Sequence, residues 1–297
     1  MSTSEPDRPA SRTAVLVCQG RAAADGRLAV GRFSDPVAVR LLWPAEQALV
    51  EQVRAARPPQ GWAERTAYEA VRAGAAVMAP RTVAVDDAIR AHPSPQLVVL
   101  GAGLDDRAWR MPELDAVEVW EVDHPSSQRD KRDRLGDLER HARAVRFCAV
   151  DFARDDLAAA LAEAGHRPDV ATTWLWEGVV PYLTSGEIRA TLEVVDRRSA
   201  PGSTLVVAYQ APSPRAAAGR LLAGLLARIG GGTAVTAGEP WRSLLTPRRV
   251  AAVLAAAGFG VTTDEDLLTV ARRLSPAPSG RVSLRSGRVV VATRRGR

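Results

Sequence analysis

Cysteine and long apolar runs are scarce in this chain of 297 residues, and each scarcity excludes a class of protein. The two cysteines, Cys18 and Cys148, form no Cys-x-x-Cys motif and no Cys/His cluster, so we expect no structural metal site and a reducing cytoplasm as the compartment. No apolar run approaches the ~20 residues that span a bilayer, so we expect no membrane segment. Residues 1–10 are polar and predict a short disordered tail instead of a signal peptide.

Lysine is almost absent, because Lys131 is the only one, and arginine therefore supplies the excess positive charge of +6. A basic excess can indicate nucleic-acid binding. Here the arginines are spread along the chain and interleaved with acids, and the basic cluster at residues 294–297 ends the chain. A phosphate-binding surface needs clustering, so we expect no nucleic-acid partner.

The hydrophobic content of 46% suffices for one large α/β domain with additions or for two small ones. Apolar spacing in residues 11–92 predicts an N-terminal helical cap. Its helices are expected at 13–24, 46–56, 64–78 and 81–91, with Pro80 ending the third.

Residues 93–297 alternate between apolar runs and helical stretches, which predicts βαβ units and a parallel sheet. Strands are expected at 97–100, 117–122, 145–150, 170–176 and 204–208, and helices at 128–143, 155–164 and 185–198. A further helix from Thr246 to Ala257 precedes strands near 259–263 and 288–293.

Residues 211–245 interrupt this alternation with an apolar helix at 215–229 and three glycines at 230–232. A surface excursion and a lid over an acceptor pocket both fit this pattern. Glycine hinges beside a site are typical of lids, so we favour a lid-like insertion.

The most informative segment is Leu97-Val-Val-Leu-Gly-Ala-Gly-Leu-Asp105, in which an apolar strand meets a glycine pair. Gly101 and Gly103 allow a sharp turn and a close approach to a ligand because they lack a Cβ atom. A second apolar run ends with Glu121 and Asp123, and a carboxylate at such a strand end can accept hydrogen bonds from a ribose diol. Together these features predict a nucleoside-containing cofactor.

Asp106 occupies the third position of the Gly-x-Gly-x-x-Gly dinucleotide fingerprint, beside Asp105. Two carboxylates suit a helix N-terminus but would repel a pyrophosphate, which disfavours an NAD-dependent oxidoreductase. S-adenosylmethionine carries a sulfonium and no phosphate, so it fits this turn better. An ordinary βα turn with capping acids is the alternative interpretation.

The sequence resembles the leucine carboxyl methyltransferase-like group of class I S-adenosylmethionine-dependent methyltransferases, from about Ser11 to the C-terminus. Several ordered motifs are more specific together than any one alone. They are Phe33-Ser-Asp-Pro36, Arg81-Thr82 with Asp86-Asp87, Leu100-Gly-Ala-Gly-Leu-Asp105 with Trp109-Arg110, Glu121-Val-Asp-His-Pro125 with Gln128 and Lys131, Asp151-Phe152, and Glu177-Gly-Val-Val-Pro-Tyr-Leu183.

The resemblance implies a Rossmann-like α/β fold with a mostly parallel seven-stranded sheet, the helical cap of residues 11–92 and a methyltransferase domain of residues 93–297 with the insertion at 211–245. The last two strands resemble the terminal β-hairpin of that fold, with one antiparallel strand. The implied activity is methyl transfer from S-adenosyl-L-methionine.

The resemblance also implies which residues contact the cofactor. Arg81 would grip its carboxylate through bidentate hydrogen bonds, with Arg21 as a weaker candidate for the same group. Glu177 would bind the ammonium or favour the sulfonium electrostatically. The remaining candidates are Gly101 and Gly103 for the methionine or ribose portion, Asp123 for the ribose hydroxyls with Glu121 as the competing acid, and Asp151 and Phe152 for adenine.

No convincing catalytic base emerges from the sequence. His124 and Tyr182 are weak candidates, and an ordinary His-Pro turn explains His124 better than catalysis does. A carboxylate acceptor is already ionised at neutral pH and needs no base. We therefore expect O-methylation of a carboxylate on a small molecule or peptide. Methylation of a hydroxyl on a small metabolite and non-catalytic binding of S-adenosylmethionine are the alternatives.

Overall fold

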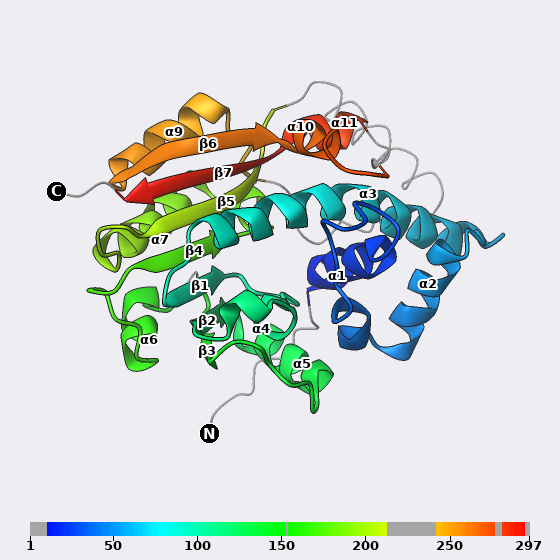
Figure 1. Cartoon of the computed structure of the whole chain (residues 1–297), viewed down its shortest axis with the longest axis horizontal. Helices are drawn as coiled ribbons and strands as arrows, with labels where there is room; N and C mark the ends of the chain where they lie inside the picture. The colour runs from blue at the N-terminus through cyan, green and yellow to red at the C-terminus, as the bar shows by residue number, and fades with distance from the viewer. Residues whose placement is uncertain (1–10, 153, 213–241, 277–280, 295–297) are drawn as a thin grey trace.

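The computed structural model describes residues 11–152, 154–212, 242–276 and 281–294, which fold around one seven-stranded sheet (Figure 1). The predicted tail at 1–10 and most of the predicted insertion, residues 213–241, lie outside the described residues. The strands are β1 Gln96–Leu100, β2 Glu118–Asp123, β3 Ala144–Ala149, β4 Thr172–Trp176, β5 Thr204–Gln210, β6 Phe259–Asp266 and β7 Gly287–Arg294.

The strand order is β3-β2-β1-β4-β5-β7-β6. The first five strands of this order are parallel to one another, whereas β7 is antiparallel to both β5 and β6. This arrangement confirms the predicted mostly parallel sheet and its terminal hairpin. The order reverses direction at β1, so a crevice opens beyond the carboxyl ends of β1 and β4.

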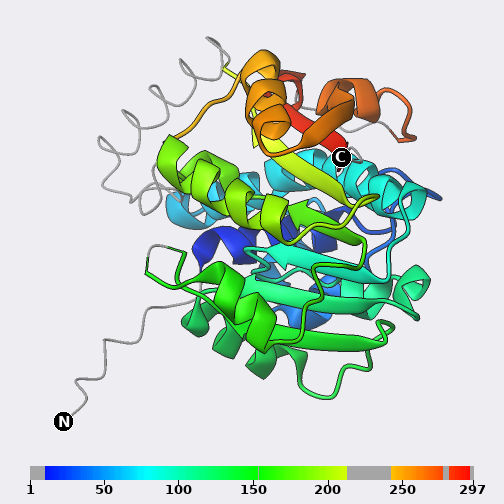
Figure 2. The same ribbon diagram turned by 90° about the vertical axis from the view of Figure 1, so that its left-hand side faces the viewer.

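Helices cover both faces of the sheet (Figures 1 and 2). Alternate residues of β1 feed two separate cores, since Leu97 and Val99 belong to one and Val98 and Leu100 to the other. The helices of the first core are α1 Arg12–Ala24, α2 Pro44–Arg54, α3 Trp62–Ala91, α4 Arg107–Arg110, α5 Pro125–Leu135, α10 Leu267–Ala271 and α11 Arg281–Ser286. Those of the second are α6 Leu157–Glu163, α7 Ser185–Arg197 and α9 Pro247–Ala256.

The predicted break at Pro80 is wrong, because α3 runs through this residue from Trp62 to Ala91. A proline inside a helix removes one backbone hydrogen bond and crowds the preceding turn. Here that cost is offset by burial along the helix, where Val71, Ala79 and Val83 are almost fully covered. Arg81 therefore lies in the middle of a long helix and not at a helix start.

Helix α5 is shorter than predicted and ends at Leu135, because Gly136 follows with a φ of +47°. Such a backbone conformation stops a helix and favours glycine. None of the described helices is long and apolar enough to cross a membrane.

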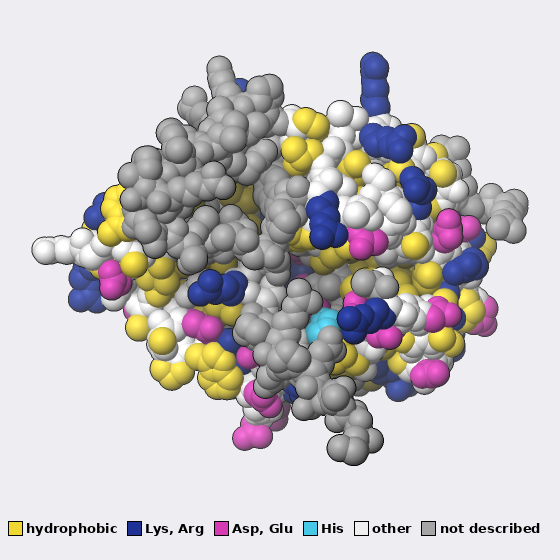
Figure 3. Space-filling view, turned by 180° about the vertical axis from the view of Figure 1, so that it is seen from behind, with side chains coloured by type: hydrophobic (Ala, Val, Ile, Leu, Met, Phe, Trp, Pro, Cys, Tyr) yellow, Lys and Arg dark blue, Asp and Glu magenta, His cyan; other side chains and the backbone are white. Residues whose placement is uncertain are grey.

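Positive and negative side chains are interspersed on the face shown in Figure 3. This face has no continuous basic stripe among the residues that the structure describes, and phosphate binding needs such clustering. The lack of a nucleic-acid partner stays a prediction.

A buried histidine marks the amino ends of the strands. The ring of His166 lies 5.3 Å from those of Trp120 and Trp174, measured between centroids, and its Nδ1 accepts a hydrogen bond of 3.2 Å from Arg198 Nε. Burial lowers the pKa of His166 to about 4, and the charges of Arg198 and Arg167 act in the same direction. The folded protein therefore holds this ring neutral.

We expect His166 to destabilise the fold in acid. The unfolded chain binds a proton at His166 below pH ~6.5, whereas the folded chain binds it only near pH 4. The free energy of unfolding should fall between these values by at most about 1.4 kcal/mol per pH unit. Titration of the ring protons by NMR measures the pKa directly.

The matched comparison is His166→Gln, which should lack this slope in denaturant unfolding at pH 4.5, 5.5 and 7. Burial raises the pKa of both Asp106 and Glu121 to about 7, so these acids favour folding at low pH and lose that contribution as the pH rises towards 7. Their effect is common to both proteins and cancels in the difference. A His166 ring that titrates near 6.5 would contradict the prediction.

Candidate functional site

A cavity of about 480 Å³ opens at the carboxyl ends of β1, β2 and β4. Its volume lies in the range of small-molecule and cofactor sites. All the predicted cofactor-binding residues except Glu121 line it, and so do His124 and Tyr182. The cavity thus joins segments from α1, α3, the glycine turn after β1 and the ends of three further strands.

The turn after β1 has the backbone that its glycines allow, with a φ of +68° at Gly101 and +49° at Gly103. A Cβ atom at Gly101 would collide with the side chain of Val179. The backbone N–H of Gly103 donates to Asp123 Oδ2 over 2.5 Å, and that of His124 donates to Oδ1 over 2.6 Å. Asp123 therefore fixes the turn and still faces the cavity.

Glu121 lies two residues before Asp123 on the same face of β2, but deeper in the protein. It is 1% exposed and forms an ion pair with Lys131 Nζ, which also donates to the carbonyl of Asp105. Burial raises the pKa of Glu121 to about 7, although Lys131 opposes this rise. Of the two competing acids, Asp123 alone lines the cavity.

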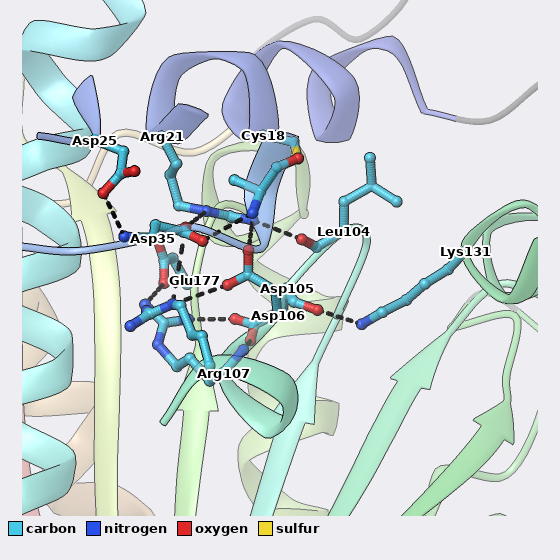
Figure 4. A network of polar contacts seen from close by, with 12 residues as sticks. Cys18, Arg21, Asp25, Asp35, Leu104, Asp105, Asp106, Arg107, Lys131 and Glu177 are labelled. Carbon is cyan, nitrogen blue, oxygen red and sulfur yellow. Dashed lines mark hydrogen bonds and ion pairs between the residues drawn. The ribbon is translucent and has the colours of Figure 1, made fainter. Parts of the chain in front are cut away.

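A network of buried charges supports the floor of the site (Figure 4). Arg21 donates to Asp35 over 2.8 Å, to Asp106 over 3.0 Å and to the carbonyl of Leu104 over 2.7 Å. Its Nε and Nη2 are thus used to hold the glycine turn against α1. This geometry makes Arg21 a support of the cavity wall, although its side chain also lines the cavity.

Asp105 and Asp106 stand just before α4, as expected of acids at a helix start, but both are engaged by buried arginines. Asp105 pairs with Arg107, and Asp106 accepts a hydrogen bond of 2.9 Å from Arg110. Burial would raise the pKa of Asp105, but Arg107 and other cations outweigh it and lower that pKa to about 2. The role of Arg107 was not predicted from the sequence, where its one signal is its place directly after two acids.

Arg81 and Glu177 both line the cavity and form an ion pair, with Arg81 Nε 2.6 Å from Glu177 Oε1. Arg81 Nε is nevertheless buried without an aligned hydrogen-bond partner among the described residues. Glu177 Oε2 accepts from Arg107 Nη2 over 2.9 Å. Burial would raise the pKa of Glu177, but Arg107 and Arg81 outweigh it and hold that pKa below its usual range.

Asp151 and Phe152 follow β3 and complete the wall beside Asp123, since Val150 N–H donates to the carbonyl of Asp123 over 2.8 Å. This contact aligns the ends of β2 and β3. The structure thus places an acid and an aromatic ring next to the acid at the end of β2, where the sequence predicted them.

His124 caps the N-terminus of α5 through its ring. Its Nδ1 accepts from Ser126 N–H over 3.3 Å and lies 2.8 Å from Ser126 Oγ. Nδ1 of His124 is thus engaged by Ser126 at the start of α5. Among the described residues, no group of His, Cys, Asp and Glu could hold a metal ion.

Comparison with known sequences gives a family match. Residues 14–196 match the sequence model of leucine carboxyl methyltransferase. A segment of 120 residues is 40% identical to a putative S-adenosyl-L-methionine-dependent methyltransferase of Mycobacterium sp. (strain KMS). Another of 135 residues is 37% identical to one of Parafrankia sp. (strain EAN1pec). These segments cover 40% and 44% of this chain and the same shares of the relatives, so the chain spans less than half the length of the curated relatives it matches.

Two solved structures share the fold. A putative methyltransferase from Thermobifida fusca YX has a TM-score of 0.54 at 14% identity, over 98% of this chain and 97% of that one. A possible exported protein from Bordetella parapertussis has a TM-score of 0.53 at 17% identity, over 99% and 100%. With the strand order, this likeness confirms the Rossmann-like class I methyltransferase fold.

Proposed function

The chain belongs to the leucine carboxyl methyltransferase family, and we propose that it transfers a methyl group from S-adenosyl-L-methionine to a carboxylate of a small molecule or peptide. One observation carries the proposal. A single cavity brings the glycine turn and Asp123 together with Arg81 and Glu177.

The lining fits the two ends of that cofactor. Both Asp123 oxygens accept a backbone N–H, yet each carboxylate oxygen has a second lone pair that can accept from a ribose hydroxyl. Asp151 and Phe152 stand beside it for adenine. Asp105, Asp123 and Asp151 also belong to the lining, and their carboxylates would repel a pyrophosphate.

Arg81 and Glu177 suit the amino-acid end. Arg81 Nε already lies 2.6 Å from the carboxylate of Glu177, and a planar guanidinium fork can bind a second carboxylate through its remaining N–H groups. The ionised Glu177 is placed to accept from an ammonium group, while Arg107 keeps it fixed. Glu121 is left out of this assignment because Lys131 covers it.

The chemistry of the lining favours an acceptor that is already ionised. The cofactor supplies an electrophilic methyl group, and the protein has to align an acceptor oxygen with it and exclude water. Such alignment can lower a barrier by several kcal/mol. Nδ1 of His124 is engaged by Ser126 in the cap of α5, so this nitrogen is not available to take a proton from a hydroxyl acceptor. A carboxylate needs no such base.

Transfer of tritium from methyl-labelled S-adenosylmethionine tests the proposal. The protein is incubated with fractionated small-molecule and peptide extracts, and the products are treated with mild alkali. We expect labelled product that releases volatile methanol, as a methyl ester does. Alkali-stable label would indicate methylation of a hydroxyl instead. Binding of the cofactor without any transfer would support a non-catalytic protein.

A further inference from the structure

The lining of the cavity also includes Tyr182, Leu183, Glu187 and Arg242, to which the proposed function gives no role. Tyr182 belongs to a short 3-10 helix, Val180–Tyr182, and Glu187 to the first turn of α7. The assignment of cofactor contacts uses none of these four residues. They are therefore available to a second ligand in the same cavity.

The backbone around Arg242 is hydrogen-bonded to the segment that carries Tyr182. The N–H groups of Arg242 and Ser243 both donate to the carbonyl of Pro181, over 2.7 Å and 3.1 Å. Ser243 Oγ donates to the carbonyl of Leu183 over 2.5 Å. Three hydrogen bonds thus hold the start of the Arg242 side chain at the cavity, although residues before it are outside the described part of the chain.

The three arginines of the described lining differ in how their charge is balanced. Arg21 pairs with Asp35 and Asp106, and Arg81 lies against Glu177. For Arg242, which is exposed, no carboxylate of the described residues lies within ion-pair distance. Within the described part of the chain, the positive charge of Arg242 is therefore not neutralised by an ion pair, and its side chain lines the cavity.

Glu187 is an acid of the lining that senses the charge of Arg242, but its carboxylate caps a helix. Its Oε2 accepts a hydrogen bond of 2.6 Å from Thr184 N–H and completes the capping box of α7. These hydrogen bonds lower the pKa of Glu187, and the charge of Arg242 adds a smaller effect in the same direction. Arg242 is thus close enough to be felt electrostatically, while the carboxylate is held by the helix.

We propose that Arg242 binds the carboxylate of the acceptor and so selects organic acids over neutral alcohols and amides. This inference rests on the proposed function, which assigns other residues of the same cavity to the cofactor. A planar guanidinium grips a carboxylate through two parallel hydrogen bonds. Each carboxylate oxygen keeps a second lone pair, which can face the methyl group.

Titration of the protein loaded with S-adenosylhomocysteine tests the role of Arg242. The probes are acetate, hexanoate, benzoate and phenylacetate, each compared with its primary amide by ligand-observed NMR. The wild type should bind at least one acid about tenfold more tightly than its amide, since a charged hydrogen bond contributes about 1.5 to 3 kcal/mol. Arg242→Gln should lose this preference, and Arg242→Lys should keep part of it.

Arg189→Gln is the matched control, because Arg189 is exposed on α7 and does not line the cavity. It should bind the acids like the wild type. All variants should bind S-adenosylhomocysteine as tightly as the wild type does. This measurement separates the inference from the proposed function, because a wild type that does not bind S-adenosylhomocysteine would overturn the proposed function. Equal binding of acids and amides, acid binding unchanged in Arg242→Gln, or no binding of any acid would overturn the role of Arg242.

Discussion

Replacement of Asp123 by Asn is expected to lower the affinity for S-adenosylhomocysteine by about 100-fold, because it removes charged hydrogen bonds that contribute about 1.5 to 3 kcal/mol each. Asp123 does two things at once. It accepts the N–H groups of Gly103 and His124, and it would accept the ribose hydroxyls. An amide keeps the size of the side chain but replaces one acceptor oxygen with an NH2 group. This donor would face the backbone N–H of Gly103 or His124, so that hydrogen bond would be lost.

Isothermal titration calorimetry measures this loss, and Glu118→Gln provides the control. Glu118 begins the same strand, lies 3.7 Å from Arg146 and is far from the carboxyl end of β2. The control should bind like the wild type. Burial raises the pKa of Asp123. As the pH falls towards this pKa, Asp123 takes up a proton, so the affinity of the wild type should also weaken. An Asp123→Asn variant that binds within threefold of the wild type would remove Asp123 from the proposed site.

The glycine turn and the strands around it could be predicted from the sequence because each depends on residues close together in the chain. The run from Leu97 to Leu100 is buried on both faces, and its branched residues form a strand wherever helices cover the sheet. Gly101 supplies a positive φ that other residues rarely adopt. The acid at the end of the next strand then follows from the parallel arrangement.

Contacts between distant segments explain what the sequence did not reveal. Arg21 and Asp106 are 85 residues apart, and their pairing follows no local period. The role of Glu121 depends on its ion pair with Lys131, which belongs to α5. The alternation within β2 places Glu121 and Asp123 on the same face, so it could not separate these two acids.

Pro80 shows the converse. Proline usually ends a helix, but burial of the residues around Pro80 keeps α3 continuous. Ala79 directly before it and Thr82 two residues after it are fully buried in α3. A break at this point would expose the apolar faces of α3 to water, and burial of each large side chain contributes about 1.5 to 3 kcal/mol. The same continuity places Arg81 at a fixed rotation about the helix axis, which directs it to Glu177.

Loss of the Arg81 guanidinium is expected to discriminate between the two ends of the cofactor. Arg81→Met should weaken binding of S-adenosylhomocysteine by about 100-fold, since it removes a bidentate charged contact to the carboxylate. It should leave binding of 5′-methylthioadenosine within about threefold, because that probe has the same adenosine but no amino-acid group. Arg107 should keep Glu177 ionised and in place in this variant.

Arg72→Met is the matched control, because Arg72 lies on the same helix but is exposed and pairs with Glu69. It should bind both ligands like the wild type, and Arg81→Lys should fall between the wild type and Arg81→Met, since an ammonium keeps the charge without the planar fork. A parallel loss of both ligands in Arg81→Met would mean that Arg81 acts by supporting the cavity. A selective loss of the ligand with the amino-acid end requires direct contact, because a distorted wall would weaken the adenosine contacts of both.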